Sequence, residues 1–179
     1  SFLEEYKSNR IIGYSRDILS ILESKSPEEF IGNVVHTERN GAAMRTVPIG
    51  VLQDIKRVVE YSIINAQVSH NTGSAIAASA AIALASHYFF HGIGQSNELF
   101  DFCLDNMGDF DTESLEYLVK VSKMGDLKPE VLFGEEHKNH GVPIHGLKTA
   151  GAVLYILTHY SHNAMETLKQ AVLLGGDTD

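Results

Sequence analysis

The chain has 179 residues, of which 44% are hydrophobic and 21% are charged, so it can bury the core of one globular domain and is neither disordered nor fibrous. Its formal net charge of −9 repels phosphate backbones, which argues against nucleic acid as a partner. The single cysteine, Cys103, cannot form an internal disulfide, and its apolar neighbours predict a buried thiol in a cytoplasmic protein.

Apolar residues recur at helical spacing along almost the whole chain. Ser15 is a good N-cap for a first helix, and Pro27 begins the first turn of a second. From Val51 to Ala66 the spacing predicts an amphipathic helix with one buried face. The run from Gly73 to Phe90 is apolar on all sides and rich in alanine, which is typical of the central helix of a bundle.

The most apolar stretch of that central helix, residues 75–85, is too short to span a bilayer, so no membrane partner is expected. Asp111 or Thr112 caps a further helix that ends near Gly125, and residues 147–160 and 161–174 form a last helical pair. No segment alternates as a strand would. The sequence therefore predicts an all-α fold, a compact orthogonal multi-helix bundle, with residues 1–179 in a single domain.

Two long connections are rich in turn residues, one from Gly32 to Gly50 and the other from Leu127 to Gly146. Long ordered loops on a helical scaffold are where binding sites tend to lie. In the first connection, Asn40 and Gly41 precede Ala42 and another alanine, which leaves backbone amides uncovered for phosphate or sugar hydroxyls. An ordinary tight turn is the commoner meaning of the same residues.

Two further side chains of the first connection, one large and apolar and one charged, have predicted locations. Met44 is expected in the core. Arg45 either meets a phosphate or holds the loop through an internal ion pair.

His70 precedes the central helix in the run Ser69-His70-Asn71-Thr72-Gly73. A positive charge is disfavoured at a helix N-terminus, so a neutral ring hydrogen-bonded to a hydroxyl is plausible there. The alternative is a capping segment with an incidental histidine, in which Asn71 or Thr72 is the cap.

The chain's last residues, Gly175-Gly176-Asp177-Thr178-Asp179, follow a helix. In an extended turn the carboxylates of Asp177 and Asp179 point the same way and can reach one hard cation such as magnesium or manganese. An Asp-x-Asp after a glycine C-cap is more often a solvated surface, so spacing alone identifies no metal site.

The order of these motifs along the chain is more specific than any one motif alone. Asn-Gly-Ala-Ala-Met-Arg-x-x-Pro-Ile-Gly, then Ser-His-Asn before an alanine-rich helix, then Ala-Val-Leu-Leu-Gly-Gly-Asp-Thr-Asp resembles the ADP-ribosylglycohydrolase family, which includes the dinitrogenase reductase-activating glycohydrolases. The resemblance covers nearly the whole chain. It implies an all-α hydrolase that binds two divalent cations, magnesium or manganese, in one cleft.

The same resemblance assigns roles to individual residues. Asp177 and Asp179 would be the catalytic metal ligands. Asn40 and Gly41, with Ala42 beside them, would bind the diphosphate and the distal ribose of ADP-ribose, and His70 would help to hold the substrate. The expected reaction is hydrolysis at the anomeric carbon of that ribose, which releases a modified protein side chain or another leaving group.

The sequence also departs from the family pattern. A Thr-Asp-Asp run with a nearby Glu is usual near the N-terminus of relatives, and no such run precedes Asn40 here. Residues 1–179 are therefore expected to be part of a larger ADP-ribosylglycohydrolase domain, without its N-terminal metal-binding segment and its C-terminal end. We expect these residues alone to bind metal weakly and to hydrolyse substrate poorly.

Two alternatives belong to other classes of protein. His137, His140 and His145 have a spacing that could bind zinc, although no cysteine lies nearby. A catalytically inactive ADP-ribose-binding or structural protein could also use the same scaffold. The sequence leaves the scissile linkage, the choice between magnesium and manganese, the general base and the oligomeric state open.

Overall fold

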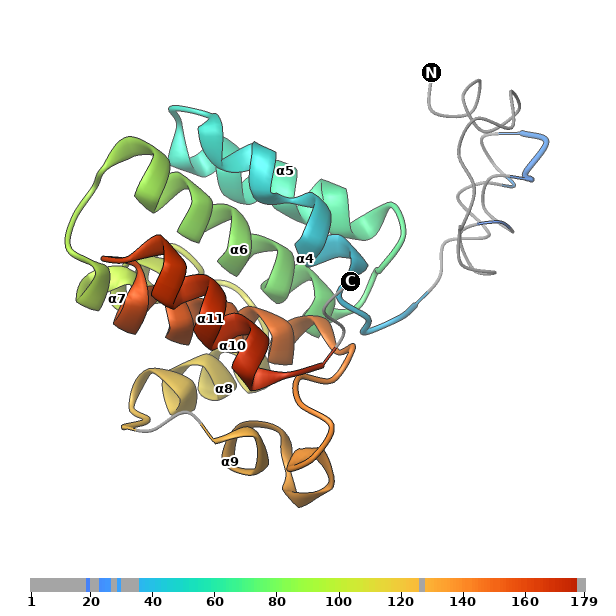
Figure 1. Cartoon of the computed structure of the whole chain (residues 1–179). Helices are drawn as coiled ribbons and strands as arrows, with labels where there is room; N and C mark the ends of the chain where they lie inside the picture. The colour runs from blue at the N-terminus through green and yellow to red at the C-terminus, as the bar shows by residue number, and fades with distance from the viewer. Residues whose placement is uncertain (1–18, 20–22, 27–28, 30–35, 126–127, 177–179) are drawn as a thin grey trace.

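The computed structural model describes residue 19, residues 23–26 and 29, and residues 36–125 and 128–176 (Figure 1). The predicted helices at Ser15 and Pro27 lie outside these residues. Within them the chain is helical, and its only bridges are two isolated pairs, Arg39 with His145 and Val142 with Gly176. The all-α prediction is confirmed.

The helices follow one another with short connections. In chain order the structure has α4 (Gly41–Arg45), the 3-10 helix η1 (Val47–Val51), α5 (Ile55–Gln67), α6 (Gly73–His91), η2 (Ser96–Glu98), α7 (Leu99–Asp105), α8 (Thr112–Ser122), α9 (Pro129–Phe133), η3 (Glu135–His137), α10 (Gly146–Tyr160) and α11 (Ala164–Leu174).

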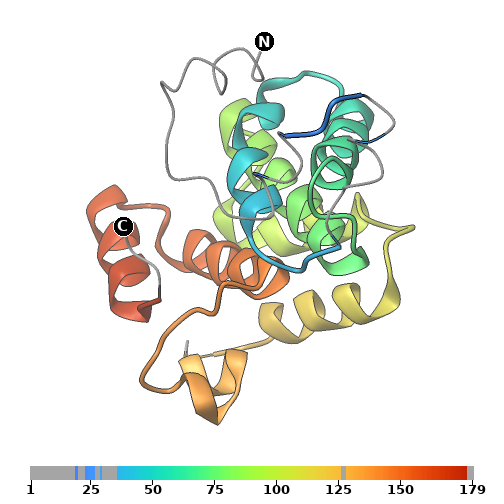
Figure 2. The same cartoon turned by 90° about the vertical axis from the view of Figure 1, so that its right-hand side faces the viewer.

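Helix α6 lies at the centre of the bundle, between α5 with α4 on one side and α10 on the other (Figures 1 and 2). Its alanines are fully buried, and their small side chains let the neighbouring helices approach closely. Thr72 caps its start by accepting a hydrogen bond from the backbone N–H of Ala75, at 3.3 Å, and Gly92 ends it in the left-handed conformation, with φ of 61°.

Helix α6 is also longer than the apolar stretch that predicted it. With 19 residues, it is the one helix in the described ranges that is long and apolar enough to cross a membrane, but 67% of its apolar window is buried inside the protein. A core helix has the same length and composition.

The predicted start of α5 at Val51 is wrong. Val51 belongs to η1, whose first turn contains Pro48, and Leu52 after it is extended. Helix α5 begins at Ile55 because the carboxylate of Asp54 caps it, accepting from the backbone N–H of Lys56 at 2.9 Å.

The other predicted helices are present with small changes at their ends. Asp111 is the cap of α8, and α11 begins at Ala164, where Asn163 caps it. Cys103 lies in α7, which the sequence analysis did not name as a helix, and it is fully buried as predicted. Burial raises the pKa of this thiol well above its ordinary value.

Candidate substrate-binding site

The two long connections in which sites were expected meet each other. The backbone N–H of Asn40 donates to the carbonyl of Ile144 at 3.0 Å, and that of Gly146 donates to the carbonyl of Glu38 at 2.7 Å. The imidazole Nε2 of His145 lies 3.5 Å from the Glu38 carboxylate. Segments about one hundred positions apart in sequence therefore form one continuous wall beside the start of α4.

The end of α11 joins the same wall. The backbone N–H of Val142 donates to the carbonyl of Gly175 at 3.2 Å. Gly175 and Gly176 have φ of 73° and 107°, which side-chain-bearing residues rarely adopt. A Cβ at Gly141 would overlap the backbone of Gly175 and Gly176, so a glycine is required for this approach. The structure thus brings together two of the predicted site regions, the Asn40 loop and the Gly175-Gly176 segment.

A pocket of about 160 Å³ lies at this junction. Asn40 and Thr149 are the polar side chains among its lining residues, and most of the remaining lining is apolar and comes from α10, α11 and residues 142–144. The Asn40 side chain is half-buried, and no hydrogen bond to another described residue occupies its amide. This amide is therefore available to a ligand at the pocket.

His70 lies directly against Gly41. A Cβ at Gly41 would lie 2.9 Å from both Cε1 and Nε2 of the His70 ring, which is closer than real Cβ contacts. The ring is buried, with 6% of the residue exposed. Two residues that the motif order links, 29 positions apart, are thus in contact, and only glycine at position 41 leaves room for the ring.

A hydrogen-bonded relay orients His70. The Arg45 guanidinium donates to Ser69 Oγ at 2.6 Å, and Ser69 Oγ lies 2.8 Å from His70 Nδ1. Because arginine is always a donor, the Ser69 hydroxyl accepts from it, and the described hydrogen bonds offer the hydroxyl proton no other acceptor than Nδ1. A Ser69 hydroxyl that donates to Nδ1 leaves the proton of a neutral ring on Nε2, which lies with Cε1 on the ring edge that faces Gly41.

Asn65 of α5 fastens the loop to this relay. Its Nδ2 donates to the carbonyl of Ala42 at 3.0 Å, and its backbone carbonyl accepts from Arg45 at 3.1 Å. No motif in the sequence marks Asn65. The signal that could have found it is an amide among apolar neighbours, Ile64 and Ala66, in an otherwise amphipathic helix.

Comparison with known proteins decides what this site belongs to. A family model, the ADP-ribosylglycohydrolases, matches residues 2–179. The chain belongs to the ADP-ribosylglycohydrolase family. No curated protein matches the chain. The family match supports a hydrolase of the ADP-ribosylglycohydrolase type, and the family implies ADP-ribosylated substrates in general.

The structure places the family-motif residues in different ways. Asn40 lines the pocket and is half-buried, as is Gly41 beside it, whereas Ala42 is fully buried and its carbonyl accepts a hydrogen bond from Asn65. The prediction for Met44 is wrong, since it is 68% exposed on the outer side of the short helix α4. Arg45 holds the loop, as one alternative proposed, but its partners in the described part of the chain are the neutral Asn65 and Ser69 and not an acidic side chain.

The predicted metal ligands Asp177 and Asp179 lie outside the described residues. Members of the family are generally metal-dependent. Among the residues that the structure describes, no group of three or more histidine, cysteine or acidic side chains could hold a metal ion, so His137, His140 and His145 do not form a zinc site there.

Proposed function

We propose that this protein hydrolyses the glycosidic bond between ADP-ribose and a modified protein side chain, using a pair of divalent cations, magnesium or manganese, in the cytoplasm. In this proposal Asn40 and Gly41, supported by Ala42, bind the diphosphate and distal ribose, and His70 holds the substrate beside them. Asp177 and Asp179 are the catalytic metal ligands.

The observation that carries the proposal is the packing of His70 on Gly41, next to Asn40 and the pocket. A neutral ring with its proton on Nε2 donates a hydrogen bond without adding charge, which suits a ribose hydroxyl. The relay from Arg45 through Ser69 orients the ring before a ligand arrives. Preorganisation of this kind lowers the entropic cost of binding.

The donor set at the end of the chain fits a hard divalent cation. Asp177 and Asp179 are carboxylates that directly follow Gly176, whose backbone pairs with Val142 at the pocket wall. Two carboxylates supply part of an oxygen ligand shell. A bound cation pair would polarise the anomeric centre and activate water for its attack.

The test is release of free ADP-ribose by the complete protein from proteins ADP-ribosylated on arginine or on serine. We expect release with magnesium or manganese and none after chelation. Asp177→Asn with Asp179→Asn should lower the rate by about 100-fold or more, because metal ligands are lost. Asp101→Asn, an exposed carboxylate on α7, is the matched control and should keep the rate.

Two outcomes would contradict the proposal. Release that continues at the same rate after chelation or in the double variant would refute the metal-dependent mechanism. ADP-ribose binding without any hydrolysis would favour the catalytically inactive ADP-ribose-binding protein instead.

A further inference from the structure

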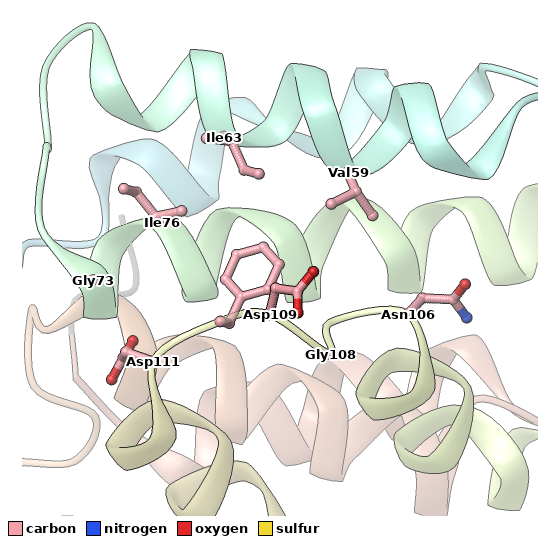
Figure 3. A pocket seen from close by; sticks show the side chains of 9 residues that line it. Val59, Ile63, Gly73, Ile76, Asn106, Gly108, Asp109 and Asp111 are labelled. Atoms are coloured by element: carbon pink, nitrogen blue, oxygen red, sulfur yellow. The ribbon is translucent and has the colours of Figure 1, made fainter.

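A second and larger pocket, of about 380 Å³, lies on α5 and α6 away from the Asn40 wall, and the two pockets share no lining residue. It forms where residues 106–111, between α7 and α8, face the two long helices (Figure 3). Its volume falls within the roughly 300–1,000 Å³ of typical ligand sites. It is large enough for one long side chain.

The walls of this pocket are apolar. Val59 and Ile63 reach toward it from α5, and Ile76 contributes from α6 (Figure 3). Phe110, in the connection, also lines it. All four are partly exposed. A purely hydrated ion gains nothing from such walls, whereas an aliphatic chain does.

The polar groups at the rim are hydrogen-bond acceptors. Asp109 has no ion pair or hydrogen bond within the described part of the chain. Asp111 uses Oδ1 to cap α8, at 3.0 Å from the Ser114 backbone nitrogen, and its Oδ2 lies beside Gly73. The amide nitrogen of Asn106 donates to the carbonyl of Phe102 at 2.8 Å, so the amide oxygen remains to accept a hydrogen bond from a ligand. Such a rim suits a ligand rich in donors.

The part of the chain that lines the pocket is rich in acidic residues, although Lys56 and Arg57 precede Val59 on α5. From Val58 to Val119 the sequence contains no lysine or arginine, although it contains eight carboxylates: Glu60, Glu98, Asp101, Asp105, Asp109, Asp111, Glu113 and Glu116. These residues carry most of the protein's net charge of −9. Their field attracts a cation and repels phosphate, so a nucleotide is an unsuitable occupant.

We propose that this pocket binds an arginine or lysine side chain of the ADP-ribosylated partner protein, and so contributes to substrate choice. The aliphatic stem would lie on Val59, Ile63 and Ile76, with the cationic head at Asp109 and Asp111. The inference rests on the proposed function for the identity of the partner. Gly73 lines the pocket three residues after His70, so both sites are built on the connection between α5 and α6.

The first experiment reads the pocket alone, without ADP-ribose or metal. N-acetyl-arginine amide is titrated into the whole chain while the methyl resonances of Ile63 and Ile76 are followed by NMR. We expect saturable shifts at both methyls, and none with N-acetyl-citrulline amide, which has the same shape and no charge. Equal shifts with both probes, or no shift with arginine, would overturn the proposal.

Variants locate the charge that matters. Asp109→Asn with Asp111→Asn should weaken arginine binding by at least about tenfold, since charge-assisted hydrogen bonds are lost. Asparagine at position 111 can still cap α8, so the fold is kept. Asp101→Asn, outside the pocket, is the control. Unchanged affinity in the double variant would refute the role of the two carboxylates.

The second experiment asks whether the occupant belongs to the substrate. KM for hydrolysis is compared between an ADP-ribosylated peptide with a neighbouring arginine and the same peptide with citrulline there. A lower KM for the arginine peptide, lost in the double Asp variant, is expected. Equal KM values would overturn the substrate role. If neither peptide is hydrolysed, the proposed function is wrong, and the NMR titration still tests whether the pocket binds arginine.

Discussion

Two buried histidines lie at opposite ends of α6, and they differ in what holds them. His70 precedes the helix and is 6% exposed, and His87 lies near its last turn and is 5% exposed. Each marks the place where a glycine of the preceding segment approaches closely, Gly41 at His70 and Gly50 at the backbone of His87. Burial and packing alone would not separate a functional histidine from a structural one.

Their hydrogen-bond partners do separate them. His87 Nδ1 lies 3.1 Å from the carbonyl of Gly50, and its ring is 4.4 Å from that of His91, between centroids. It thereby ties η1 to α6. His70 Nδ1 instead meets the Ser69 hydroxyl at the end of the relay from Arg45. The backbone partner of His87 indicates an anchor, whereas the side-chain relay at His70, beside the pocket residue Asn40, is consistent with the substrate-binding role that we propose for it.

The largest difference should appear at the two glycines. In Gly50→Ala the new Cβ would lie 2.5 Å from the His87 backbone nitrogen and from Ser86 Cβ, neither of which can turn away. We expect the free energy of unfolding to fall by about 3 kcal/mol in urea denaturation. In Gly41→Ala the new Cβ meets the far edge of the His70 ring, which can shift at the cost of its hydrogen bond to Ser69, so the loss should be about 1 kcal/mol. Equal losses of stability would contradict the distinction between a structural His87 and a less constrained His70.

The histidines themselves should divide in the same direction. His87→Gln removes a buried ring that bonds to Gly50, and we expect it to lower the free energy of unfolding by about 2 kcal/mol. His70→Gln should cost less than about 1 kcal/mol, because a long amide can still meet the Ser69 hydroxyl. Thermal or urea unfolding of both variants measures this. A larger loss for His70→Gln would show that His70 is the anchor.

The smallest expected effect concerns the relay. Ser69→Ala leaves Arg45 and His70 without their shared partner, and we expect ADP-ribose affinity to fall about fivefold, the equivalent of about 1 kcal/mol. Ser62→Ala is the matched control, since its buried hydroxyl bonds only to the Val59 carbonyl, at 2.7 Å. Its affinity should be unchanged. A calorimetric titration that finds the same loss in both would remove the relay from the site.

The sequence predicted α6 well because its pattern is local. Thr72 is one of the two proposed caps, and the helix extends one residue beyond the predicted Phe90. The start of α5 was missed because Val51 keeps the helical spacing although Pro48 and Asp54 divide the segment into two helices. Met44 was misplaced because α4 has only five residues, too few for periodicity to show which face is buried.

The candidate site depended more on motif order than on physical pattern. No spacing rule could place His70 on Gly41, because the contact depends on how α5 turns the chain back. The partner wall at Val142 and Ile144 lies in a connection that the sequence marked only as long and rich in turn residues, and the glycine at position 141 acquires meaning only once Gly175 lies against it. The acidic pocket on α5 and α6 combines residues from three segments, each unremarkable alone.

The most direct test of the account is a calorimetric titration of ADP-ribose, with magnesium, into the complete protein and three variants. Asn40→Ala and His70→Gln should each weaken binding by about tenfold, since the first removes the Asn40 amide and the second replaces the oriented ring that we propose holds the substrate. His87→Gln should bind with unchanged affinity at a temperature where it is folded. Unchanged affinity in Asn40→Ala and His70→Gln would contradict the claim that ADP-ribose binds at this end of α6.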